Sequence, residues 1–113
     1  MGTNDDTGPI SAPVPVLWVG DRRILLRQGA NRVGREPGSE VRPHDVSVSR
    51  AHARIDVQRL DVTVVDLNSK NGTWVQGVPI HAPAAVNHGD DLMFGTVVAR
   101  FVIERPDDST TAR

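Results

Sequence analysis

The stretch Ala53-Arg54-Ile55-Asp56-Val57-Gln58 decides the fold class of this chain. Apolar and polar residues alternate along it, so one face points inward and the other outward with the period of two that a β-strand requires. The stretch from Val97 to Ile103 repeats the alternation near the end of the chain. Val98 and Val102 are apolar there as well, which predicts that this last strand is covered on both faces. Both stretches predict a protein built from sheets.

Outside these two stretches, apolar residues come in short runs that turn residues interrupt roughly every 6–12 positions, a spacing typical of all-β proteins. We find no convincing helical pattern. The sequence therefore predicts an all-β fold, a β-sandwich of two mainly antiparallel, twisted sheets with about eleven short strands. Gln76-Gly77 predicts a tight hairpin with Gly77 in the left-handed conformation. The shift of apolar parity at Val64-Val65 predicts a bulge.

The composition excludes several classes of function. The chain has 113 residues, which fits one domain, and its net charge of −1 indicates neither a nucleic-acid partner nor membrane insertion. It has no cysteine, which excludes disulfides, thiolate zinc sites and cysteine nucleophiles. No apolar run approaches the roughly 20 residues that span a bilayer, and the acidic, polar N-terminus is unlike a secretory signal. We expect a soluble, cytoplasmic protein.

Both ends of the chain are rich in polar residues and proline. Residues 1–15 predict a disordered N-terminal tail, and residues 105–113 predict a disordered C-terminal one. The folded β-sandwich is then expected to span residues 16–104.

Three segments between the expected strands contain more charged and polar side chains than a simple connecting loop requires: residues 32–35, 46–52 and 66–73. A sandwich gathers its loops at two ends, so we expect a ligand site where these loops meet at one end. The polar side chains that would converge there are Arg35, Ser49, Arg50, Lys70 and Asn71. Two guanidiniums, an ammonium, a hydroxyl and an amide suit a dianionic phosphate with three acceptor oxygens.

Other chemistries have weaker support in the sequence. Ser49, His52 and Asp66 invite comparison with a hydrolase triad, but no nucleophile elbow or oxyanion hole accompanies them. The four histidines are scattered without the spacing of metal ligands. Gly34-Arg35 does not open a P-loop, because no Gly-Lys-Ser or Gly-Lys-Thr follows it. We therefore predict no enzyme activity, no metal and no cofactor.

Five short blocks resemble, in order and spacing, the pattern of the forkhead-associated (FHA) domain. They are Gly34-Arg35, Ser49-Arg50-Ala51-His52, Asn71-Gly72-Thr73, Gly89-Asp90 and Phe94-Gly95. The resemblance covers about Val16 to Ile103. It implies a non-catalytic adaptor module that binds phosphothreonine peptides, prefers them to phosphoserine peptides and acts in signalling by serine/threonine kinases. The alternative is a phospho-independent interaction domain that uses a sheet face of the same fold.

The resemblance also implies a role for each matching residue. Arg35 and Ser49 would bind the phosphate with Arg50 and Lys70 beside them, and Asn71 would hold the peptide backbone. The residues implied to support the site are Gly34, His52, Gly72 and Thr73, and the loop implied to set specificity contains Ser47 and Val48.

Two positions depart from the family pattern. Gln76 stands where asparagine is common. Ser47 is short and neutral, which argues against a strong preference for an acidic third residue after the phosphothreonine. The implied partners are a threonine-phosphorylated protein or peptide and an upstream kinase. The domain's own tail is a further candidate ligand, through a phosphorylated Thr3 or Thr7.

Overall fold

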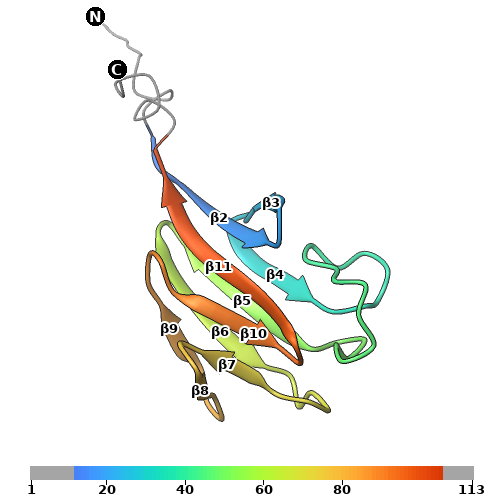
Figure 1. Ribbon diagram of the computed structural model, residues 1–113. Coiled ribbons are helices and arrows are strands. Elements are labelled where there is room, and N and C mark those ends of the chain that lie inside the picture. Colours follow the sequence, from blue (N-terminus) through green and yellow to red (C-terminus); the bar gives the residue numbers. More distant parts are fainter. Residues whose placement is uncertain (1–11, 106–113) are drawn as a thin grey trace, which may run out of the picture.

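The computed structural model describes residues 12–105 (Figure 1). Most of both predicted tails, with Thr3 and Thr7, lies outside the described residues. Within the described range the chain forms a six-stranded and a four-stranded sheet, numbered from β2 as in Figure 1. The strands are β2 (Val14–Val19), β3 (Arg22–Leu25), β4 (Gly29–Val33), β5 (Ala53–Gln58), β6 (Asp61–Asp66), β7 (Thr73–Val75), β8 (Val78–Pro79), β9 (Ala84–Val86), β10 (Asp91–Phe94) and β11 (Val97–Glu104).

The two sheets form the predicted sandwich. One has the order β3-β2-β11-β10-β7-β8, the other has the order β4-β5-β6-β9, and every pair of neighbouring strands is antiparallel. The all-β prediction is confirmed, with ten strands among residues 12–105 against the roughly eleven expected. The part of the chain described here contains no helix long and apolar enough to cross a membrane.

The core lies between the inner faces of the two sheets. Leu17, Phe94 and Phe101 fill it from the six-stranded sheet, and Ile55 and Val64 fill it from the other. Burial of each such side chain stabilises the fold by about 1.5–3 kcal/mol.

The alternation in β5 is confirmed by its burial pattern. Ala53, Ile55 and Val57 are buried, while Arg54 and Asp56 face outward and form an ion pair of 2.8 Å.

Two of the local predictions are wrong. The register between β5 and β6 is continuous, so Val64-Val65 forms no bulge. Val62 and Val64 keep the inward parity, and Val65 is simply an apolar residue on the outer face. In β11, Val98 is 57% exposed, so this strand is not covered on both faces at that position. An apolar residue on an outer face is common, and periodicity alone does not separate it from a core residue.

The predicted hairpin is confirmed between β7 and β8, where Val75 pairs with Val78. Gln76 and Gly77 both have positive φ, 51° and 77°, as a two-residue type I′ turn requires. Glutamine tolerates this conformation less well than asparagine. Its backbone N–H donates to the Asp91 carbonyl (2.8 Å) and its side-chain oxygen accepts from the Asp91 N–H (2.6 Å), which offsets the strain.

Residues 34–52, residues 67–72 and the β10–β11 turn lie together at one end of the sandwich (Figure 1). Hydrogen bonds between these segments confirm that they share that end. The start of β2 and the end of β11 lie at the opposite end.

Candidate functional site

The long connection from β4 to β5 is closed by backbone contacts. The N–H groups of Arg35 and Glu36 donate to the carbonyls of Ser49 and Arg50, both at 3.1 Å. Gly34 makes this approach possible, because a Cβ at its position would overlap the carbonyl oxygen of Arg50. The strand end that carries Arg35 is therefore held against the segment that carries Ser49.

Arg35 is held in place by one edge of its guanidinium. Its Nε donates to the carbonyl of Val48 at 2.6 Å, and its own carbonyl accepts from Nε of Arg42 at 2.9 Å. Among residues 12–105, neither terminal nitrogen of Arg35 has a hydrogen-bond partner, and the residue is exposed. The two terminal nitrogens are free to bind an anion.

Ser49, Lys70 and Asn71 meet next to Arg35. The backbone N–H of Lys70 donates to Oγ of Ser49 at 3.0 Å, which leaves the hydroxyl hydrogen of Ser49 available as a donor. The side-chain nitrogen of Asn71 donates to the carbonyl of Ser47 at 2.9 Å, which leaves its Oδ1 as an acceptor. The structure thus brings together the side chains of Arg35, Ser49 and Asn71, and it brings Lys70 to them through its backbone N–H.

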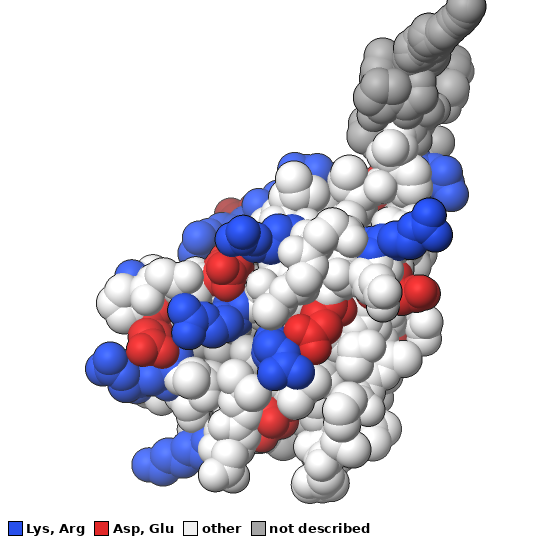
Figure 2. Space-filling view, turned by 180° about the vertical axis from the view of Figure 1, so that it is seen from behind, with Lys and Arg blue, Asp and Glu red and all other residues white. Residues whose placement is uncertain are grey.

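Arg50, the fifth predicted ligand residue, contributes its carbonyl to the bond with Glu36, and its side chain is exposed. No ion pair involves Arg50 or Lys70 in the described range. Figure 2 views the molecule from behind and shows basic side chains projecting from its left edge, where the loop end lies. The chain as a whole carries a charge of only −1, so the positive charge at the site is local.

His52 is fully buried and joins two of the loops. Its Nδ1 accepts from the backbone N–H of Ser49 at 3.0 Å, and its Nε2 lies 2.8 Å from the carbonyl of Gly72. A backbone N–H only donates, so Nδ1 carries no proton and Nε2–H is the donor to Gly72. The ring also packs edge-on against Phe94, with centroids 5.9 Å apart.

Asp66 organises the third loop. It accepts from the Ser69 hydroxyl (2.6 Å), the Ser69 N–H (3.0 Å) and the hydroxyl of the buried Thr73 (2.6 Å). The Ser69 hydroxyl in turn accepts from the N–H of Gly72 at 2.9 Å. Burial acts to raise the pKa of Asp66, but the hydrogen bonds from Ser69 and Thr73 outweigh it and lower the pKa below its ordinary value of 3.8.

The β10–β11 turn supports the second loop from the side. Oγ of Ser47 donates to Asp45 (2.7 Å) and accepts from the N–H of Thr96 (3.0 Å), and it lies 2.9 Å from the Thr96 hydroxyl. Gly95 is required beside it, because a Cβ there would overlap the carbonyl of Ser47. The hydrogen-bonding capacity of the Ser47 hydroxyl is therefore used by contacts within the domain.

Val48, its partner in the predicted specificity loop, is fully buried in the core. Only its carbonyl lies at the site, where it accepts from Arg35.

The geometry does not form a hydrolase triad. Both ring nitrogens of His52 are used by backbone groups, and the carboxylate of Asp66 bonds to Ser69 and Thr73 rather than to His52. Across residues 12–105, no three His, Cys, Asp or Glu side chains lie together in a way that could hold a metal ion.

Sequence reasoning missed Arg42, Asp45, Ser69 and Thr96 as supports of the site. Asp45 and Ser47 have the spacing of a local side-chain turn, which could have indicated their bond. Thr96 lies 49 residues from Ser47, and no local signal links the two.

Comparison with known proteins identifies the family of this chain. The family model described as FHA domain matches residues 31–95. The glycogen accumulation regulator GarA of Mycobacterium tuberculosis is 38% identical over 73 residues, which cover 65% of this chain and 44% of GarA. The oxoglutarate dehydrogenase inhibitor of Corynebacterium glutamicum is 38% identical over 73 residues, 65% of this chain and 50% of that protein. This chain thus spans about half the length of these curated relatives.

Among solved structures, one FHA domain comes from a structural and functional analysis of phosphothreonine-dependent FHA domain interactions. It matches with a TM-score of 0.76 and 30% identity, over 80% of this chain and 97% of its own. The five blocks that indicated the site lie within residues 31–95, which the FHA-domain model matches.

Gly34→Ala tests the loop closure. The added Cβ should force residues 34 and 50 apart and lower the free energy of unfolding by about 1–3 kcal/mol. Amide hydrogen exchange at Arg35 and Glu36 should accelerate, because their bonds to Ser49 and Arg50 are lost. Gly38→Ala is the control: its φ of 92° makes alanine strained there as well, but the Cβ meets open space. It should therefore cost stability without separating residues 34 and 50, and it should leave both amides protected. Unchanged exchange in Gly34→Ala would contradict the closure.

Asp66→Asn tests the third loop through pH. The pKa of Asp66 is lowered by folding, so its contribution to stability is complete above 3.8 and is lost as the pH falls through the folded value. At neutral pH the variant should be less stable than the wild type by about 1–3 kcal/mol. The difference should shrink below pH 3.8 in urea titrations. Asp61→Asn, exposed in the β5–β6 hairpin, is the control. If the stability difference between Asp66→Asn and the wild type is the same at neutral pH and below pH 3.8, the carboxylate charge is not involved.

Proposed function

Because this chain belongs to the FHA-domain family, we propose that it binds threonine-phosphorylated peptides and performs no catalysis. The observation that carries the proposal is the convergence of Arg35, Ser49 and Asn71, each held by a bond to the protein and each with a further group free for a ligand. The solved FHA domain from the study of phosphothreonine-dependent interactions supports the choice of ligand.

The phosphate would be bound by Arg35 and Ser49. The terminal nitrogens of Arg35 and the hydroxyl hydrogen of Ser49 donate to its oxygens, while Lys70 and Arg50 add positive charge. Each charge-assisted hydrogen bond contributes about 1.5–3 kcal/mol. Because binding also costs translational freedom and the ordering of a flexible peptide, a few such bonds give reversible rather than permanent association.

Asn71 would position the peptide backbone. Its nitrogen is fixed on the Ser47 carbonyl, so its Oδ1 is oriented before the ligand arrives and can accept from a peptide N–H. Ser47 has no free hydroxyl with which to bind a charged neighbour of the phosphothreonine. We therefore propose that an acidic third residue gives no strong advantage.

Phosphorylation switches the ligand from neutral to about −2, so the site responds to kinase activity. We propose the role of an adaptor or regulator downstream of a serine/threonine kinase in the cytoplasm. The relatives named as a glycogen accumulation regulator and an oxoglutarate dehydrogenase inhibitor are consistent with a regulatory role.

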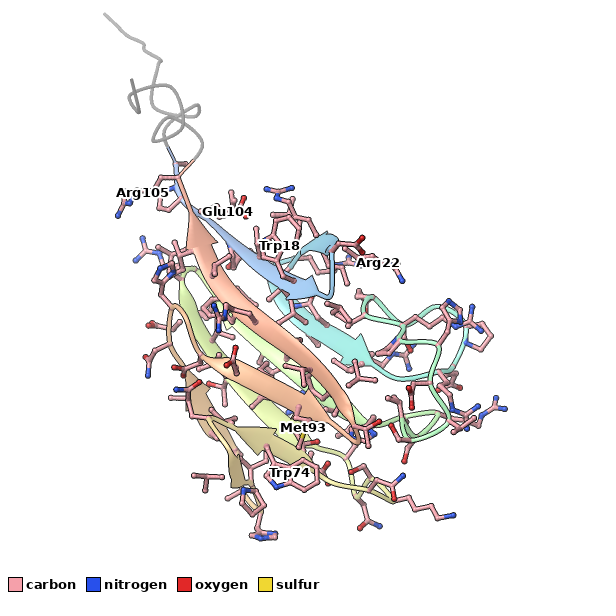
Figure 3. The ribbon with its side chains drawn as sticks, viewed as in Figure 1. Trp18, Arg22, Trp74, Met93, Glu104 and Arg105 are labelled. Atoms are coloured by element: carbon pink, nitrogen blue, oxygen red, sulfur yellow. The ribbon has the colours of Figure 1, made fainter. Side chains whose placement is uncertain are left out.

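Arg35→Ala is the direct test. It should weaken binding of a phosphothreonine peptide roughly 100-fold, measured by calorimetry or fluorescence anisotropy, because two charge-assisted bonds are lost. Arg105→Ala is the matched control, an exposed arginine at the end of β11 away from the loops (Figure 3). Binding that survives Arg35→Ala, or that is equal for phosphorylated and plain peptides, would favour the phospho-independent sheet-face alternative.

The tail offers a second test. An extended chain covers at most about 3.3–3.6 Å per residue, so Thr3 can reach about 38 Å from Val14 and Thr7 only about 25 Å. The seven steps from Val97 to Glu104 cover about 24 Å between the two ends. Phosphorylated Thr3 should therefore compete within one molecule and weaken binding of an external phosphopeptide by about tenfold or more. Phosphorylated Thr7 should compete less, because its fully extended reach of about 25 Å barely matches this span. Unchanged affinity in both cases would exclude the tail as a ligand.

A further inference from the structure

Four apolar side chains form a row across the outer face of the six-stranded sheet. Pro79 of β8 pairs with Trp74 of β7, Trp74 pairs with Met93 of β10, and Met93 pairs with Val98 of β11. Their chain neighbours in β7, β10 and β11 point into the core, so these four point outward. We call them the apolar row. Figure 3 shows the side chains of Trp74 and Met93 next to each other on this face.

The apolar row is open to a partner. Val98 is 57% exposed, Pro79 is exposed, and Trp74 and Met93 are only half-buried. A hollow of about 230 Å³ lies along it. The hollow is lined by Trp74, Gly77, Asp91, Leu92, Met93 and Val98. It is smaller than an ordinary small-molecule pocket of about 300–1,000 Å³, and it suits one large side chain.

Polar and charged side chains cover part of the same face next to the apolar row. Two residues further along the strands, Arg100 pairs with Asp91 at 2.9 Å. Beyond it, Glu104 accepts from the indole of Trp18 at 3.1 Å and from Nε of Arg23 at 2.9 Å. The apolar row has no such polar cover among residues 12–105, and exposed apolar surface rimmed by charged groups is typical of a contact site.

The apolar row adjoins the loops of the phosphopeptide site. Trp74 lies two residues after Gly72, and a Cβ on Gly72 would lie 2.9 Å from Cη2 of the indole, so the ring packs against the loop itself. Val98 lies two residues after Thr96, which contacts Ser47. Two residues of a strand span about 7 Å. An extended peptide held at Asn71 therefore reaches the apolar row within a few residues.

We propose that the apolar row binds a large apolar side chain, such as leucine, of the same phosphorylated ligand that occupies Arg35, Ser49 and Asn71. This inference rests on the proposed function. The ligand is the favoured occupant because the site is continuous with the row: once the phosphate is bound, the outer residues of the peptide are at high local concentration and need only a single apolar contact. The row would then select among phosphothreonine ligands by a residue distant from the phosphate.

The test compares two kinds of peptide. A phosphothreonine peptide library is randomised near the phosphate and carries only alanine and serine at the outer positions. The tightest binder from this library is called the core peptide. A single leucine is then placed at each outer position on either side. At one position, leucine should tighten binding to the wild-type domain about tenfold, as burial of one such side chain allows.

The variants separate the row from the phosphate site. Val98→Asp and Met93→Gln should abolish the gain from leucine and leave affinity for the core peptide within about twofold. Leu25→Asp is the matched control, because Leu25 is also 57% exposed and pairs with Val16 on the same outer face, near the opposite end of the sheet. It should keep the full gain. Arg35→Ala should weaken binding of both the core peptide and the leucine-containing peptide.

Each contrary outcome has a separate meaning. If the core peptide binds in a phosphate-dependent way but no leucine tightens it, the apolar row is not part of the ligand site and the proposed function stands. If phosphorylation has no effect on any peptide, the proposed function and this inference both fail. If sedimentation shows a dimer that Val98→Asp converts to monomer, with no change in the leucine gain, the row binds a second copy and the inference is wrong.

Discussion

The buried imidazole of His52 is the contact on which the geometry of the site depends. It accepts from the N–H of Ser49 and donates to the carbonyl of Gly72, and so it links the loop that carries the candidate phosphate ligand to the loop that carries Lys70 and Asn71. Without the imidazole, the N–H of Ser49 would lose this partner, at a cost of about 1–3 kcal/mol for an unpaired polar group. The Gly72 carbonyl would keep its bond from the N–H of Gly95 at 2.9 Å. A single neutral side chain thereby fixes the distance between two segments twenty residues apart.

The ligand groups follow from this backbone framework. Arg35, Ser49 and Asn71, the candidate ligand residues, each use one part of the side chain to bind the domain and leave another part available. Their orientation is thus set before binding, and less rotamer freedom remains to be lost when the ligand arrives. Gly34 and Gly95 have no side chain, and this is required because a Cβ at either position would separate the loops that carry these groups.

The sequence predicted the parts of the fold that local patterns control. Alternation identified β5, and Gln76-Gly77 identified the β7–β8 turn, because side-chain period and turn conformation are properties of a few neighbouring residues. The predictions at Val64-Val65 and Val98 were wrong, because apolar character does not say which face a residue occupies. The motif blocks placed the candidate ligand groups at one end, but the support from Thr96 to Ser47 joins residues 49 positions apart and has no local signal.

The exposed position of Val98 connects the fold to recognition. Val98 stands near the start of β11, and in the described part of the chain no layer covers it or its neighbours Met93 and Trp74 on the outer face. Trp74 also packs on Gly72, so the same indole touches the candidate peptide site and belongs to the apolar row. A ligand that contacts both surfaces would gain charge-dependent binding from the loops and apolar burial from the sheet. The charge-dependent contribution would respond to phosphorylation, and the apolar contribution would distinguish one phosphorylated sequence from another.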